Sequence, residues 1–111
     1  MLFYPALRFD DGLLQGYGIS QDVPIKAGQG ALAKGTLLMK DEDDLMVVAT
    51  SIIGQTLRVL YEAVDTTEEQ KTAMTLVWGC IKKDLLIVPE TIDLNSAVAV
   101  CGLAEKGIYL S

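Results

Sequence analysis

Apolar residues between positions 36 and 88 occur in short runs that polar turns separate. In the clearest run, the residues that share one face are Leu57, Val59, Tyr61 and Ala63, with Arg58, Leu60 and Glu62 between them. This alternation is typical of a half-buried β-strand. The whole pattern predicts strands at residues 36–40, 45–50, 57–64, 72–82 and 85–88. Gly79, inside the fourth of these strands, indicates a β-bulge or a close approach of another backbone.

Helical periodicity is convincing near the C-terminus, at about residues 94–106. Thr91 or Asp93 can cap this helix, and Gly107 suits the left-handed residue that follows many helices, before Ile108 packs back. The predicted apolar stripe comprises Leu94, Ala97, Val98, Cys101 and Ala104. Two further apolar residues, Val100 and Leu103, widen it. Because the stripe is wide, we expect burial on two sides, and such a helix can also contact a neighbouring subunit.

Residues 1–22 are rich in apolar side chains but follow neither the period of a strand nor that of a helix. The apolar positions are Leu2, Phe3, Tyr4, Leu7, Phe9, Leu13, Leu14, Tyr17 and Ile19. A disordered tail is normally poor in aromatic residues, so this segment is expected to bury its side chains. Two interpretations stay open: an irregular first strand on its own domain, or an arm that becomes ordered on a partner. We favour an extended, partner-binding N-terminal arm at residues 1–22 and a β-rich domain at residues 23–111, in a mainly β (α+β) fold.

Glycines in residues 23–39 have some of the spacing of a phosphate-binding loop. Gly30 and Gly35 match the two glycines of a Walker-type loop, but Thr36 follows Gly35 directly and the lysine is missing. A dinucleotide site is disfavoured because no apolar strand precedes Gly28 and a strand, not a helix, is predicted to follow. Gly28, Gly30 and Gly35 therefore predict a turn that leads from the arm into the β-rich domain. Positive φ is expected at Gly28 and Gly30, and a strand is expected to start at Gly35 and Thr36 after a tight turn.

The composition of the chain disfavours several classes of function. The chain has 111 residues, the size of one domain, and its content of 50% hydrophobic and 6% aromatic residues predicts an aliphatic core. A net charge of −6 disfavours nucleic-acid binding. The apolar runs are too short to cross a bilayer and no signal peptide is recognisable, so we expect a cytoplasmic product without a membrane partner. Cys80 and Cys101 lack metal-site spacing, so we expect buried reduced thiols, with a disulfide left open.

Candidate catalytic and metal-binding groups are weak. Histidine is absent, and no serine or cysteine stands in a recognisable nucleophile motif. The carboxylates of Glu62, Asp65, Glu68 and Glu69 have no spacing that fixes an acid–base pair, and the run 41–44 lacks the glycine and distant glutamate of a calcium loop. Both groups are interpreted as solvated turns. The sequence therefore predicts no catalytic residue, no cofactor and no metal site, and hence a protein that is not an enzyme.

Four segments carry motifs that are weak alone but agree in order and spacing. Residues 23–38 contain I-K-A-G-Q-G-A-L-A-K-G-T-L-L, residues 60–65 read L-Y-E-A-V-D, residues 77–79 read V-W-G, and residues 97–110 end in L-A-E-K-G-I-Y-L. Together these segments resemble the lambda-type head decoration proteins of tailed bacteriophages. Residues 1–22 match no pattern of that family.

The resemblance implies the beta-clip-like fold of those proteins and a structural function. It implies a homotrimer that binds the major capsid protein at local threefold positions on the outer surface of the expanded head. There the protein stabilises the head against internal DNA pressure, after synthesis in the host cytoplasm and without direct contact to nucleic acid. In this interpretation the apolar residues of the arm bind the capsid. A tail or baseplate adaptor of similar β-rich build is the alternative.

Overall fold

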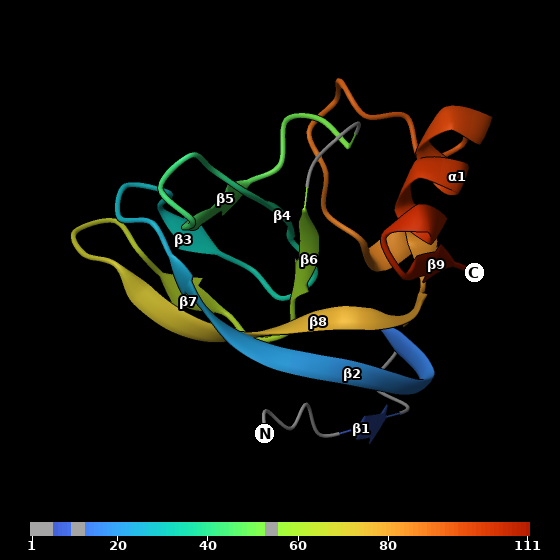
Figure 1. Cartoon of the computed structure of the whole chain (residues 1–111), viewed down its shortest axis with the longest axis horizontal. Helices are drawn as coiled ribbons and strands as arrows, with labels where there is room; N and C mark the ends of the chain where they lie inside the picture. Colours follow the sequence, from blue (N-terminus) through green and yellow to red (C-terminus); the bar gives the residue numbers. More distant parts are fainter. Residues whose placement is uncertain (1–5, 10–12, 53–55) are drawn as a thin grey trace.

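The computed structural model describes residues 6–9, 13–52 and 56–111. Strands dominate this part of the chain, which contains one α-helix, α1 (Ala97–Glu105), close to the C-terminus (Figure 1). The strands are β1 (Ala6–Phe9), β2 (Leu14–Ile25), β3 (Ala31–Leu32), β4 (Leu37–Lys40), β5 (Met46–Val48), β6 (Leu57–Leu60), β7 (Val64–Asp65), β8 (Lys71–Ile81) and β9 (Ile108–Leu110). The predicted mainly β class is confirmed.

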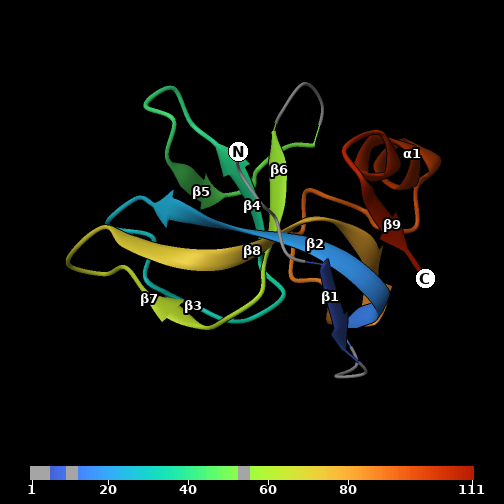
Figure 2. The same cartoon turned by 60° about the horizontal axis from the view of Figure 1, so that its bottom comes forward.

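The long antiparallel pair of β2 and β8 organises the main sheet (Figure 1). The strand order is β1-β2-β5-β4-β6-β8-β9, and because β2 also pairs with β8, the five strands from β2 to β8 close into a ring. The contact between β2 and β5 is a single parallel pair, Ile25 with Met46. Outside the ring, β1 adds to β2 and β9 adds to β8, and the views from two directions agree on this placement (Figure 2).

Aliphatic residues form two buried clusters, as the composition predicts. The first cluster includes Leu57 and Val59, and the second includes Leu60. The regular alternation of a strand places Leu60 on the opposite face from Leu57 and Val59, so β6 contributes to both clusters. Leu37 and Leu38 are both fully buried because they face different clusters. Each buried leucine contributes about 1.5–3 kcal/mol relative to an exposed one.

Two of the predicted strands differ from the structure. The predicted strand 57–64 is interrupted at Tyr61, and its last part, β7, pairs with β3 in a separate small sheet. The predicted strand 85–88 is wrong: a 3-10 helix covers Lys83–Leu85, and only Ile87 makes a bridge, to Thr36. Leu85 and Ile87 are exposed whereas Leu86 is buried, so one side chain of this segment enters the core.

Helix α1 starts later than expected and buries a different face. Ser96 caps it by accepting a 3.1 Å hydrogen bond from the N–H of Ala99, so the caps predicted at Thr91 or Asp93 are wrong. Of its two buried residues, Leu103 belongs to the predicted stripe and Ala99 does not, whereas Val98, Val100 and Cys101 of that stripe are exposed. The sequence A-V-A-V-C-G-L-A contains no charged residue, so periodicity could not select the inner face. The left-handed Gly107 (φ +87°) and the burial of Ile108 are confirmed.

The predicted boundary at residue 22 falls inside β2 and is therefore wrong as a boundary of the fold. β2 runs from Leu14 to Ile25 and pairs with β8 along its length. The strand escaped recognition because its pairing with β8 shifts register twice, between Gln15 and Gly18 and again after Ile19. Such irregularities remove the regular alternation on which strand prediction depends.

Candidate interaction surfaces

The N-terminal residues proposed as a partner-binding arm divide into three groups. Leu2, Phe3 and Tyr4 lie outside the described residues. Leu7 and Phe9 belong to β1, where they lie opposite Gly18 and Gly16 of β2, and Tyr17 lies opposite Arg8. In this structure the segment 6–9 is thus an edge strand of its own domain, which is the first of the two interpretations left open by the sequence.

The remaining arm candidates are part of the fold. Leu13 is 4% exposed and Leu14 is fully buried, and both belong to the larger core cluster. Their assignment to a partner-binding arm is wrong, because their apolar surface is already covered within the chain. Ile19 is half-buried and lies opposite Ala6 on one side and Trp78 on the other.

The turn predicted as the domain entry exists, but it connects β2 to β3 inside the fold and does not lead from an arm into a domain. The segment that follows β7 holds it. Gly28 and Gly30 have φ values of +86° and +81°, which confirms the positive φ predicted for them. The N–H of Gly28 donates a 2.6 Å hydrogen bond to the carbonyl oxygen of Thr66, and the N–H of Thr66 donates back to Gly30 at 2.8 Å. Thr66 is fully buried, and its hydroxyl also lies 3.2 Å from the Gly30 oxygen.

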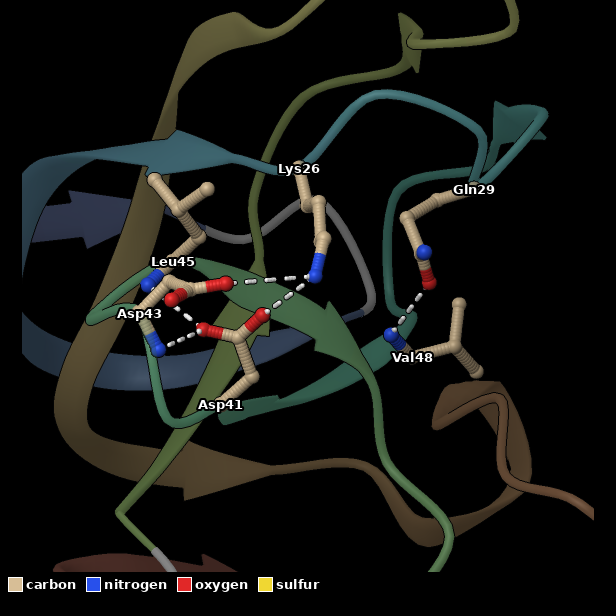
Figure 3. Close-up of polar contacts among 6 residues, drawn as sticks. All are labelled: Lys26, Gln29, Asp41, Asp43, Leu45 and Val48. Atoms are coloured by element: carbon tan, nitrogen blue, oxygen red, sulfur yellow. Dashed lines mark hydrogen bonds and ion pairs between the residues drawn. The ribbon is translucent and has the colours of Figure 1, made fainter.

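A polar cluster joins this turn to the β4–β5 hairpin (Figure 3). The Lys26 Nζ lies 3.1 Å from an Asp41 carboxylate oxygen and 3.5 Å from one of Asp43. The other Asp41 oxygen accepts hydrogen bonds from the N–H groups of Asp43 (2.9 Å) and Leu45 (3.0 Å). The Leu45 N–H is the main reason that the pKa of Asp41 is lowered, and the hydrogen bond to Asp41 is the main reason that the pKa of Lys26 is raised.

The acidic run 41–44 is the tip of this hairpin, as predicted. Asp44 occupies a left-handed turn position (φ +61°), and its carboxylate pairs with Lys40 at 3.1 Å. Next to the hairpin, the Gln29 side-chain oxygen accepts a 3.0 Å hydrogen bond from the N–H of Val48 (Figure 3). These carboxylates and amides stabilise loops, and the described residues contain no group of three or more potential metal-ligating acidic, cysteine or histidine side chains.

The carboxylates considered for acid–base chemistry also have structural partners. Glu62 accepts a 2.8 Å hydrogen bond from the N–H of Met74, and Glu69 lies 2.9 Å from the Lys71 ammonium. Asp65 accepts from both the hydroxyl and the N–H of Thr67, and the hydroxyl is the main cause of its lowered pKa. The shallow cavity at this turn, about 260 Å³, is lined by Asp65, Thr67, Glu68, Glu69 and Lys71. Asp65, Glu68 and Glu69 therefore lie together on a loop surface, and Glu62 is not among the residues that line it.

Besides Leu85 and Ile87, large exposed apolar side chains occur on β8, β9 and α1. Trp78 is 43% exposed and packs edge-to-face against Tyr109, with ring centroids 5.9 Å apart. On α1, Val98, at 64% exposed, and Val100 are exposed on opposite sides of the buried Ala99. Large apolar side chains at such positions are typical of association surfaces.

Sequence reasoning missed the exposure of Trp78 for a physical reason. Leu76 and Trp78 are two residues apart and would share a face in a regular strand. However, Trp78 lies opposite Ile19 and Leu76 opposite Ser20, so β8 contains an extra residue at this point. This bulge, predicted near Gly79, turns Trp78 outward. The close approach predicted at Gly79 is also present, since its N–H donates a 3.0 Å hydrogen bond to the carbonyl oxygen of Gly107.

Both cysteines are free thiols, so the structure contains no disulfide between them. Cys80 is half-buried and Cys101 is exposed on α1, which corrects the expectation that both are buried. Within the described ranges, no helix has the length and apolar character needed to cross a membrane. A scan against protein-family models gives no match to this chain, and a search of curated proteins gives none either.

Proposed function

We propose that this chain is a structural protein that decorates the outer surface of a bacteriophage head. It acts as a homotrimer that binds the major capsid protein at local threefold positions and stabilises the expanded head. In this proposal the described β-rich domain is a form of the beta-clip-like decoration fold. The basis is the four-segment resemblance given above, together with the places of those segments in the fold.

The observation that carries the proposal is that the four segments contact one another in pairs. The first two meet where the N–H of Gly35 donates a 2.7 Å hydrogen bond to Leu60 and where β3 pairs with β7. The last two meet where Gly79 lies opposite Ile108, with Trp78 against Tyr109. Motifs that recur in a family are expected where two segments of the fold contact each other, because such contacts fix the path of the chain. The contacts therefore support a shared fold rather than a chance match of short patterns.

The surface chemistry is compatible with this function. The exposed apolar residues of β8, β9 and α1 offer a contact surface between subunits, and β1 offers an edge strand to the capsid. A net charge of −6 suits an outer surface that binds no DNA. In a trimer three modest contacts act together, at effective concentrations of about 1 mM, so attachment is tight without a large single interface.

Binding to heads tests the proposal directly. Purified protein is mixed with expanded heads assembled from the major capsid protein of the same phage, and the particles are imaged by electron microscopy. We expect added density at local threefold positions, and heads that resist heating better than undecorated ones. Absence of binding to heads, or binding to tail tips instead, would contradict the proposal and favour the adaptor alternative.

A further inference from the structure

The edge strand β1 lies opposite a glycine of β2 at two of its four paired positions. It lies antiparallel to residues 16–19 of β2, with Leu7 opposite Gly18 and Phe9 opposite Gly16. Cross-strand side-chain pairs are the unit that stabilises sheets, and glycine offers no side chain for such a pair. Leu7 and Phe9 therefore have no directly opposite side chain on β2.

The half of β2 that carries β1 is also its irregular half. From Ser20 to Ile25, β2 pairs residue for residue with β8. Before Ser20 the register shifts twice, and Gly16 has a φ of +84°, a left-handed conformation. β2 stays in the sheet through its regular half if β1 leaves. Short edge strands on irregular partners are among the elements that open at low free energy.

We propose that β1 is a stored strand, meaning a strand that pairs with β2 in the free protein and exchanges β2 for an exposed strand of the capsid protein on the head. This inference rests on the proposed function. Exchange of one strand edge for another conserves main-chain hydrogen bonds, so side chains decide its direction. Leu7 and Phe9, which lie opposite glycines on β2, can form cross-strand pairs with side chains of a capsid strand. Storage also keeps this apolar strand from pairing with other chains before a head is available.

A reversible disulfide tests whether β1 must leave. Ala6→Cys and Ile19→Cys place two thiols at directly opposite positions, and Cys80→Ser with Cys101→Ser removes competing thiols. We expect the oxidised protein to bind expanded heads about tenfold more weakly than the same protein after reduction, because each trimer then loses its strand contacts. Equal binding of the two redox forms would overturn the proposal and show that β1 stays on β2.

A second variant acts on β2 and leaves β1 unchanged. Gly16→Ala strains the backbone at φ +84°, in a position where an added Cβ meets no atom within 4 Å, and its single methyl group adds little cross-strand contact for Phe9. We expect the amides of residues 6–9 to lose protection from hydrogen exchange. The association rate with heads should rise about threefold or more, because β1 has already separated from β2 in this variant. Gly28→Ala is the matched control, because it has the same open space and a φ of +86° but lies in the turn between β2 and β3. Lost protection at residues 6–9 without faster association would contradict the stored strand.

Binding of the wild-type protein to the same heads distinguishes a failure of the proposed function from a failure of the stored strand. If the wild-type protein does not bind heads, the proposed function fails. If it binds, and the oxidised and reduced disulfide variants bind equally, only the stored strand fails.

Discussion

A Cβ atom built on Gly35 would lie 2.6 Å from the carbonyl oxygen of Leu85, closer than real Cβ contacts come. Gly35 also has a φ of +101° and connects two segments, since its N–H donates to Leu60 at 2.7 Å and its carbonyl oxygen accepts from Ile87 at 2.8 Å. Gly35, the glycine of the G-T-L-L motif, is therefore required for two features: the turn itself and the close packing of the segment after β8.

Replacement of Gly35 should destabilise the fold more than replacement of a glycine with the same backbone conformation in open space. We expect Gly35→Ala to lower the free energy of unfolding by about 3 kcal/mol, from backbone strain together with the clash with Leu85. Gly28→Ala, which has a φ of +86° and no atom within 4 Å of the added Cβ, should lose only about 1 kcal/mol. Urea unfolding measures both values. Equal losses would show that the Leu85 carbonyl has no role.

The sequence predicted those elements whose pattern is local. Residues 36–40, 45–50 and 72–82 alternate or cluster in the manner of strands, and they correspond to β4, β5 and β8. The turn glycines were recognisable because positive φ leaves few residue types to choose from. For the candidate surface, the same local reasoning identified the apolar content of the N-terminal segment and of α1.

The parts that could not be predicted depend on pairing between distant residues. Trp78 faces outward because of a bulge opposite Ile19, and no pattern within β8 indicates where the extra residue lies. Leu14 is buried through its place in a strand with two register shifts. In α1, Val98 and Ala99 are adjacent and both apolar, so periodicity does not indicate which of them is buried. The buried face depends on the segment that packs against the helix.

Acidification should weaken the contact between the turn that connects β2 to β3 and the β4–β5 hairpin. The lowered pKa of Asp41 means that its contribution to stability is fully present above its ordinary value of 3.8 and is lost as the pH falls through the lower folded value. Asp65, with its pKa lowered mainly by the Thr67 hydroxyl, acts in the same direction. We expect the melting temperature to fall below about pH 4.

Asparagine variants isolate the Asp41 contribution to this pH dependence. Asp41→Asn removes the ion pair with Lys26 and the titration itself, so the variant should melt lower than wild type at neutral pH and lose less on acidification. Asp44→Asn is the control, because that side chain is 81% exposed and pairs only at the surface with Lys40. Calorimetry across the acid range measures these differences. An identical acid slope for wild type and Asp41→Asn would contradict the assignment.

The two faces of α1 should respond differently to shortening of their side chains. Leu103 is fully buried, so Leu103→Ala should lower the free energy of unfolding by about 2–5 kcal/mol. Val98 is 64% exposed, so Val98→Ala should change it by no more than about 0.5 kcal/mol. If the outer face forms subunit contacts, Val98→Asp should keep the melting temperature and reduce trimer formation, as measured by sedimentation or on decorated heads. A large loss of stability in Val98→Ala would show that this face is already covered in the single chain.

Two truncations should separate the binding segment from the fold. Removal of residues 1–12 deletes β1 and keeps the buried Leu13 and Leu14, so we expect a folded protein with a melting temperature close to that of wild type. Removal of residues 1–20 also deletes both core leucines and the first part of β2, and should lower the free energy of unfolding by more than about 4 kcal/mol. Thermal unfolding followed by circular dichroism distinguishes the two proteins.

The shorter truncation then tests the binding role of the N-terminal segment without the complication of misfolding. On the proposed function, the protein without residues 1–12 should be folded and should fail to decorate expanded heads at concentrations where wild type saturates them, because the strand that pairs with the capsid is missing. The matched control is Leu85→Ala in the full chain, which shortens an exposed apolar side chain (44% exposed) outside β1 and should leave decoration unchanged. Full decoration by the truncated protein would transfer the binding role from the N-terminal segment to the surface around Trp78 and α1.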